Sequence, residues 1–110
     1  MSLIPTRGDI ILLSLDPTLG HEQAGTRPAV VLSPDLYNRA SGLCLVCPIT
    51  NQVKGYPFEV PLEGTKNTTG VALADQIRSI DWRPRKIKIV DRIPPAFLAP
   101  ILAKFKPLLF

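Results

Sequence analysis

The sequence contains no long apolar run. No stretch of its 110 residues approaches the roughly 20 apolar residues that a membrane-spanning helix requires. The first residues also lack a basic segment followed by an apolar one, which is the pattern of a secretory signal peptide. We therefore expect a cytoplasmic protein without a membrane partner.

Histidine and cysteine are scarce, which argues against a metal site. His21 is the one histidine, and Cys44 and Cys47 lie three positions apart in an apolar segment. This spacing can indicate redox or zinc chemistry, but positions three apart on a strand point to opposite faces. Zinc also needs about four ligands, so we interpret both cysteines as small core residues. We expect no metal and no cofactor.

The composition is that of one folded domain spanning residues 1–110. Hydrophobic residues make up 45% of the chain and charged residues 20%. The formal net charge is +4, which favours an anionic partner such as nucleic acid or an acidic peptide.

Short strands dominate the predicted secondary structure. Apolar or alternating segments bounded by proline, glycine or polar turns predict strands at residues 8–15, 28–33, 43–49, 57–62, 70–74, 76–80 and 83–90. At Asp75 the pattern leaves two alternatives, one continuous strand or two separate ones. The result suggests a small β-barrel that carries a helix.

Two helices are expected. Ser33 as N-cap and Pro34 at the first helical position predict a short helix that ends at Gly42. Apolar residues at helical spacing predict a second helix after Pro94, which Pro100 should delay or kink. The terminal residues 107–110 are too apolar to sit freely in water, so they should pack on the barrel or on a second copy of the chain.

Several blocks along the chain carry a family resemblance. They are residues 7–10 (Arg-Gly-Asp-Ile), 16–17 (Asp-Pro), 20–23 (Gly-His-Glu-Gln), 25–33 (Gly-Thr-Arg-Pro-Ala-Val-Val-Leu-Ser), 48–50 (Pro-Ile-Thr), 54–60 (Lys-Gly-Tyr-Pro-Phe-Glu-Val) and 70–81 (Gly-Val-Ala-Leu-Ala-Asp-Gln-Ile-Arg-Ser-Ile-Asp). In this order and spacing, they closely resemble the MazF/PemK family of toxin endoribonucleases.

The resemblance implies a mainly β (α+β) fold, an SH3-like small β-barrel with a short inserted helix and a C-terminal helix. It also implies the toxin of a type II toxin–antitoxin system, which acts as an mRNA interferase. Such a homodimer cleaves single-stranded RNA at short sequences without a metal, by attack of the 2′-hydroxyl group that leaves a 2′,3′-cyclic phosphate. A cognate antitoxin with an acidic C-terminal segment would block the RNA groove.

The resemblance also assigns catalytic roles. Arg27 matches the main catalytic cation, and Thr50 matches a threonine that hydrogen-bonds the scissile phosphate. A planar guanidinium can grip two phosphate oxygens at once. Glu22 would accept the 2′-hydroxyl proton or orient Arg27, or would only form a salt bridge with it. His21 would position or protonate the leaving oxygen, or would be an ordinary surface residue.

One position separates two branches of the family. The PemK-like branch has an arginine two residues before the aspartate that matches Asp75, whereas this chain has Leu73. Without that arginine, Asp75 is not expected to act as a base, and we interpret it as a carboxylate that hydrogen-bonds the backbone near Thr50 or braces the barrel. The chain is therefore predicted to follow the MazF-like branch with Arg27 and Thr50.

Polar and aromatic side chains around these blocks are candidates for reading splayed single-stranded bases. They are Gln23, Thr26, Asn51, Gln52, Lys54, Tyr56, Asp75, Gln76 and Arg78. Tyr56 is alternatively a core aromatic, and Trp82 is more typical of a core or dimer interface than of a stacking platform. The basic run at residues 83–88 is either a solvated strand face or a track for phosphates or for the acidic antitoxin.

Two rival functions keep the same fold. Some relatives poison DNA gyrase by protein contact through a C-terminal Trp-Gly-Ile, but this chain ends in Pro-Leu-Leu-Phe. The other alternative is an RNA-binding barrel that does not cleave its ligand.

Overall fold

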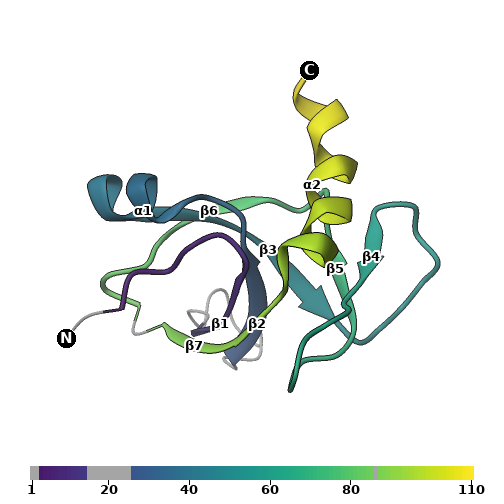
Figure 1. The fold of residues 1–110 in the computed structure, drawn as a ribbon, viewed down its shortest axis with the longest axis horizontal. Helices are drawn as coiled ribbons and strands as arrows, with labels where there is room; N and C mark the ends of the chain where they lie inside the picture. Colours follow the sequence, from purple (N-terminus) through teal and green to yellow (C-terminus); the bar gives the residue numbers. More distant parts are fainter. Residues whose placement is uncertain (1–2, 15–25, 86) are drawn as a thin grey trace, which may run out of the picture.

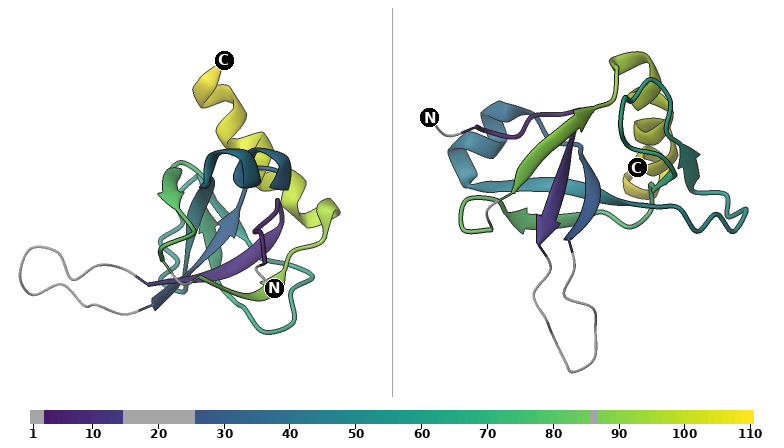
Figure 2. Two further views of the ribbon diagram at one scale, coloured as in Figure 1. Left: turned by 90° about the vertical axis from the view of Figure 1, so that its left-hand side faces the viewer. Right: turned by 90° about the horizontal axis from the view of Figure 1, so that it is seen from below.

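A curved antiparallel sheet flanked by two helices makes up the computed structural model, which describes residues 3–14, 26–85 and 87–110 (Figure 1). The elements follow one another in the order β1 (Asp9–Ser14), β2 (Thr26–Val31), α1 (Asp35–Ser41), β3 (Leu43–Thr50), β4 (Glu59–Pro61), β5 (Val71–Leu73), β6 (Arg78–Asp81), β7 (Lys88–Arg92) and α2 (Pro95–Leu109). Figure 2 shows the two helices near opposite ends of the sheet. The expected α+β architecture, with a short inserted helix and a C-terminal helix, is confirmed.

The strands follow the order β4-β5-β3-β2-β1-β7, and β6 pairs with the first half of β3. Among the described residues, no ladder joins β7 to β6 or to β4. The sheet is therefore curved but open, and the expected barrel is not closed. Pro61 lies in the edge strand β4 and has no backbone N–H to offer a further strand, as expected for an edge position.

The central strands bury both faces, because their residues alternate between two apolar clusters. One cluster lies under α2 and combines Ile10, Val30, Leu32, Cys47, Ile49, Val60, Ala72, Ala74, Ile93, Leu98 and Ile101. The other lies on the opposite face and combines Ile11, Leu13, Ala29, Val31, Cys44, Val46, Ile80 and Trp82. Burial on both faces explains why these strands are continuously apolar rather than alternating with polar residues.

The two cysteines are separated by this alternation, as predicted. Cys47 packs in the cluster under α2 and Cys44 in the opposite one, and both are free thiols. Burial raises the pKa of Cys44 to about 11 and that of Cys47 to about 12. Their interpretation as small core residues is confirmed.

The start of α1 differs from the prediction. The helix begins at Asp35 with Pro34 as its N-cap residue, and no side chain caps it. The Ser33 hydroxyl instead donates to Oδ1 of the buried Asn38, at 2.6 Å, and accepts the N–H of Leu45, at 2.9 Å. The expected N-cap role of Ser33 was therefore wrong, because a buried amide competes for its hydroxyl. The helix ends at Gly42, as predicted.

Helix α2 begins at Pro95 and contains Pro100 and Pro107, so Pro100 does not delay it. Its last residues are open to solvent in the single chain: Leu109 is 66% exposed and Phe110 is 93% exposed. The alternative in which the apolar end packs on its own sheet was therefore wrong, which leaves the alternative of a second copy. In the described part of the chain, no helix is long and apolar enough to cross a membrane.

A close approach between β5 and the end of β3 requires glycine at position 70. Gly70 has φ +116°, and a Cβ atom there would collide with the carbonyl oxygen of Thr50 and come within 2.9 Å of Oδ1 of Asn51. This contact fixes the backbone that carries Thr50. Gly55 also has a positive φ, +76°, but a Cβ atom there would meet no other atom within 4 Å.

We expect Gly70→Ala to destabilise the fold by about 3 kcal/mol, because it combines an unfavourable φ with a backbone collision. Gly55→Ala is the matched control and should cost only about 1 kcal/mol, since it carries the φ penalty alone. Urea unfolding of the three proteins measures both values. Equal losses for the two variants would contradict the close-approach argument.

Candidate active site

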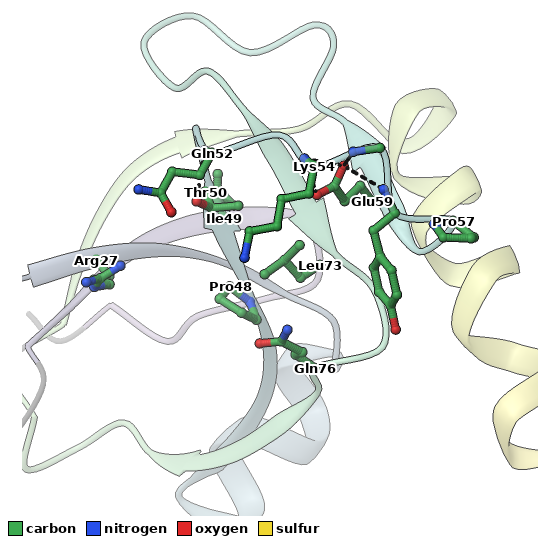
Figure 3. A pocket seen from close by; sticks show the side chains of 12 residues that line it. Arg27, Pro48, Ile49, Thr50, Gln52, Lys54, Pro57, Glu59, Leu73 and Gln76 are labelled. Atoms are coloured by element: carbon green, nitrogen blue, oxygen red, sulfur yellow. Dashed lines mark hydrogen bonds between the residues drawn. The ribbon is translucent and has the colours of Figure 1, made fainter.

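A cavity of about 710 Å³ opens beside the end of β3 (Figure 3). The start of β2, the loop after β3 and the turn between β5 and β6 contribute to its wall. Its lining residues are Arg27, Pro48, Ile49, Thr50, Gln52, Lys54, Gly55, Tyr56, Pro57, Glu59, Leu73 and Gln76. Two cations, one carboxylate, two amides, a hydroxyl and a phenol therefore share one cavity.

The register of β2 and β3 brings Arg27 and Thr50 to this cavity. The ladder pairs Val31 with Val46 and ends at Ala29 and Pro48. Extended by two residues on each strand, the same register sets Arg27 across from Thr50, and residues opposite one another share a face of the sheet. The cavity opens where the ladder ends, and both side chains line it.

Arg27 lies on a strand rather than in the polar loop where the sequence pattern places it. The predicted strand starts at Pro28, but β2 begins at Thr26 and its backbone pairs Arg27 with Leu13 of β1. The side chain of Arg27 is exposed. A strand holds the position of a functional side chain more firmly than a loop does.

Thr50 ends β3, and its hydroxyl is already oriented by the backbone. The N–H of Gln52 donates to Oγ1 of Thr50 at 3.1 Å. A hydroxyl that accepts this bond keeps its own hydrogen for donation. Thr50 can therefore offer a hydrogen bond to an anionic group inside the cavity.

The loop at residues 51–57 carries Gln52, Lys54 and Tyr56 and is held by Glu59. The Glu59 carboxylate accepts the backbone N–H groups of Lys54 at 2.9 Å, Gly55 at 3.0 Å and Tyr56 at 3.3 Å (Figure 3). Three amides on one carboxylate offset part of its charge, so Glu59 repels an anionic group in the cavity less. Glu59 was not among the site residues predicted from the sequence. The pattern that could have indicated it is a glycine, Gly55, followed four residues later by a carboxylate.

Tyr56 connects this loop to the turn between β5 and β6. Its hydroxyl donates to Oδ2 of Asp75 at 2.5 Å. This hydrogen bond is the main cause that raises the pKa of Tyr56 above its ordinary value. Tyr56 is 46% exposed, so its alternative role as a core aromatic was wrong. Of the two alternatives for the strand around Asp75, the structure has two separate strands, β5 before this residue and β6 after it.

The remaining predicted site residues lie elsewhere or outside the described residues. Asn51 accepts a hydrogen bond from the Thr69 hydroxyl at 3.1 Å, and Arg78 is exposed on β6; neither lines the cavity. His21, Glu22 and Gln23 lie outside the residues that the structure describes, and so does the side chain of Thr26. Their roles stay predictions.

Trp82 and part of the basic run have structural roles. Trp82 is buried, and its indole N–H donates to the carbonyl of Asn38 at 2.9 Å, which confirms its interpretation as a core residue. Arg83 lies over the Trp82 ring, 5.1 Å from its centroid, and donates to the carbonyl of Arg39 at 2.6 Å. Arg83 is exposed and fastens α1 to the end of β6, but it lies in a turn before β7, so the strand expected from residue 83 was wrong at this position.

Together, the cavity residues suit a flexible anionic chain that carries hydrogen-bonding groups. Arg27 and Lys54 supply positive charge, Thr50 supplies a donor, and Gln52 and Gln76 each supply both donors and acceptors. Such a mixture binds a phosphate backbone while reading the edges of unstacked bases.

Comparisons with known proteins agree with this chemistry. Residues 6–109 match the family described as PemK-like, MazF-like toxin of type II toxin–antitoxin system. The chain is 52% identical over 106 residues to the endoribonuclease toxin MazF of Escherichia coli K12, covering 96% of this chain and 95% of that protein. It is 41% identical to the endoribonuclease PemK of Escherichia coli, covering 94% and 80%.

A solved structure shows the same fold. The crystal structure of MazE-MazF (Form II) from Deinococcus radiodurans superposes with a TM-score of 0.91 at 44% identity, covering 98% of this chain and 97% of that one. The higher identity to MazF than to PemK agrees with the branch predicted from Leu73. On this sequence match and this shared fold, the chain belongs to the MazF/PemK family of toxins of type II toxin–antitoxin systems, on its MazF-like branch.

Proposed function

We propose that this protein is a sequence-specific endoribonuclease that cleaves single-stranded RNA without a metal ion. The observation that carries the proposal is one cavity that Arg27 and Thr50 line together with two amides, a second cation and a phenol. Relatives of this chain named endoribonuclease support it. RNA is a cytoplasmic substrate, so we place the activity in the cytoplasm.

The proposed reaction uses the substrate's own 2′-hydroxyl group. Its oxygen attacks the adjacent phosphorus while the bond from phosphorus to the 5′-oxygen breaks. A base takes the 2′-proton, and an acid returns a proton to the leaving 5′-oxygen. The products are a 2′,3′-cyclic phosphate and a free 5′-hydroxyl, so the atoms balance without a co-reactant.

The polar side chains of the cavity take the following roles in this reaction. The Arg27 guanidinium stabilises the charge that develops on the phosphate oxygens, and the Thr50 hydroxyl donates to one of them. Gln52, Lys54 and Gln76 contact bases and neighbouring phosphates. The base and the acid are assigned to Glu22 and His21, which lie outside the described residues.

Two protein partners belong to the proposal. Solved neighbours include complexes of MazE with MazF, so we propose that an antitoxin covers this cavity with an acidic C-terminal segment. The net charge of +4 favours such a segment. We also propose a homodimer, because Leu109 and Phe110 expose apolar surface at the end of α2.

We expect Arg27→Ala to lower kcat roughly 100-fold to 1,000-fold, because it removes a charged donor to the transition state. Arg39→Ala is the matched control: Arg39 is an exposed arginine on α1 whose guanidinium lies 3.6 Å from Asp35. Cleavage of a labelled single-stranded RNA measures the rates, and circular dichroism checks the fold. Loss of the fold in Arg27→Ala would make Arg27 structural instead.

We expect discrete cuts in a mixed-sequence RNA when a metal chelator is present in excess, and none in the same oligonucleotide with 2′-deoxy sugars. The reason is that the nucleophile is the 2′-hydroxyl and the stabilising cation is Arg27. Gel electrophoresis of both strands gives the answer. Inhibition by the chelator would refute the metal-free mechanism, while tight binding without cuts would favour an RNA-binding protein.

We expect light scattering at micromolar concentration to give the mass of two chains. The double substitution Leu109→Ser and Phe110→Ser should shift the protein toward one chain, because it removes apolar surface from the proposed contact. Leu36→Ser is the control, since Leu36 is 72% exposed on α1 and does not line the groove that Leu109 and Phe110 border. A monomeric unmodified protein would contradict the homodimer.

A further inference from the structure

The hydrogen bond between Tyr56 and Asp75 joins the two loops that border the RNA cavity. We propose that this bond sets which RNA sequences are cleaved, with Asp75 as a positioning residue that acts through Tyr56. The inference rests on the proposed function and deepens it, because it concerns the choice of sequence at the same site. In this proposal the Tyr56–Asp75 pair does not take part in the cleavage step, and its role is not simply to strengthen RNA binding.

Tyr56 reaches the cavity from a loop whose backbone is already fixed. Glu59 accepts the N–H of Tyr56 itself and those of the two preceding residues. The Phe58 ring lies 5.8 Å from the Tyr56 ring at an angle of 49°. With the backbone held, the remaining freedom of Tyr56 is the direction of its side chain. The bond to Asp75 removes that freedom.

Asp75 lies behind the cavity wall. Leu73 and Gln76, on either side of it in the sequence, line the cavity, but Asp75 does not. The turn that carries it is also held, because Gln76 donates its N–H to the Leu73 carbonyl at 3.1 Å. Ala74 donates its N–H to the carbonyl of Phe58 at 2.9 Å, which ties the two loops together beside the Tyr56–Asp75 bond.

The two carboxylate oxygens of Asp75 differ in their surroundings. Oδ2 accepts the Tyr56 hydroxyl, and Oδ1 is buried and has no hydrogen-bond partner within the described part of the chain. With Oδ1 buried and Oδ2 engaged by the phenol, this carboxylate is poorly placed to take a proton from RNA. Its available action is therefore to hold the phenol, through a charge-assisted bond of the strong, short class.

A fixed phenol gives the cavity a fixed width between the loop at residues 51–57 and the β5–β6 turn. Binding sites whose walls are set before the ligand arrives discriminate by shape and by the hydrogen bonds that a wrong base leaves unmade. Releasing the ring would let the wall adapt to other bases. The structure thus predicts that losing the bond relaxes sequence choice while Arg27 and Thr50 keep their places.

The test compares Tyr56→Phe, Asp75→Asn and the double variant with the unmodified protein. Each is assayed for kcat/KM on one efficiently cleaved RNA and on a set of single-base variants of that RNA. We expect the ratio between the best RNA and its variants to fall about tenfold in each single variant. The double variant should show no further fall, since both substitutions break one bond.

Matched controls are Tyr37→Phe and Asp35→Asn, which change the other tyrosine and an exposed aspartate on α1. Both should leave the ratio unchanged.

A phenolate titration by ultraviolet absorbance checks the bond itself in solution. Asp75 raises the pKa of Tyr56, so Asp75→Asn should lower that pKa toward the ordinary value of about 10. Because the phenol donates only while protonated, the bond is present at neutral pH and is lost as the pH rises through this raised pKa.

The outcomes separate the inference from the function on which it rests. If the unmodified protein leaves every RNA intact, the proposed function fails and the inference falls with it. If cleavage is normal and both single variants keep the original preference, the inference alone is overturned. A loss of kcat on all RNAs in Asp75→Asn, with Tyr56→Phe unaffected, would make Asp75 a catalytic residue and overturn the positioning role.

Discussion

Backbone hydrogen bonding along β3 is the interaction on which the rest of this structure depends. Its eight residues pair with β6 at the first half and with β5 at the last two residues, while the other edge pairs with β2. The register with β2, extended beyond the end of its ladder, sets Arg27 across from Thr50. The pairing with β5 brings the β5–β6 turn to the same place. One strand therefore assembles a cavity whose parts lie far apart in the chain.

The loops around this cavity are held by carboxylates rather than by apolar packing. Glu59 accepts hydrogen bonds from the backbone N–H groups of residues 54–56, and Asp75 accepts one from the Tyr56 hydroxyl. On β7, Asp91 similarly accepts the N–H groups of Lys66, Asn67 and Thr68. A site for a polyanion gains from the contacts of Glu59, because its three N–H donors offset part of its charge and it repels the ligand less.

Sequence reasoning recovered what local patterns determine and missed what depends on distant contacts. Arg27 and Thr50 flank the apolar runs predicted as strands, so their nearness to the sheet was predictable, but their inclusion in β2 and β3 was not. Ser33 is a residue type that commonly caps helices, but its hydroxyl donates a hydrogen bond to the buried Asn38 instead. No pattern in the sequence predicts that contact. The bond from Tyr56 to Asp75 spans nineteen positions and exists only after β3 pairs with β5.

The separation of the two cysteines has a consequence for how the protein responds to oxidants. Both thiols are buried in different apolar clusters, and a pKa of about 11 leaves roughly one Cys44 in ten thousand ionised at pH 7. Oxidants attack the thiolate, so neither sulfur offers a reactive target or a partner for the other. Oxidants would therefore leave both cysteines of the folded protein unmodified.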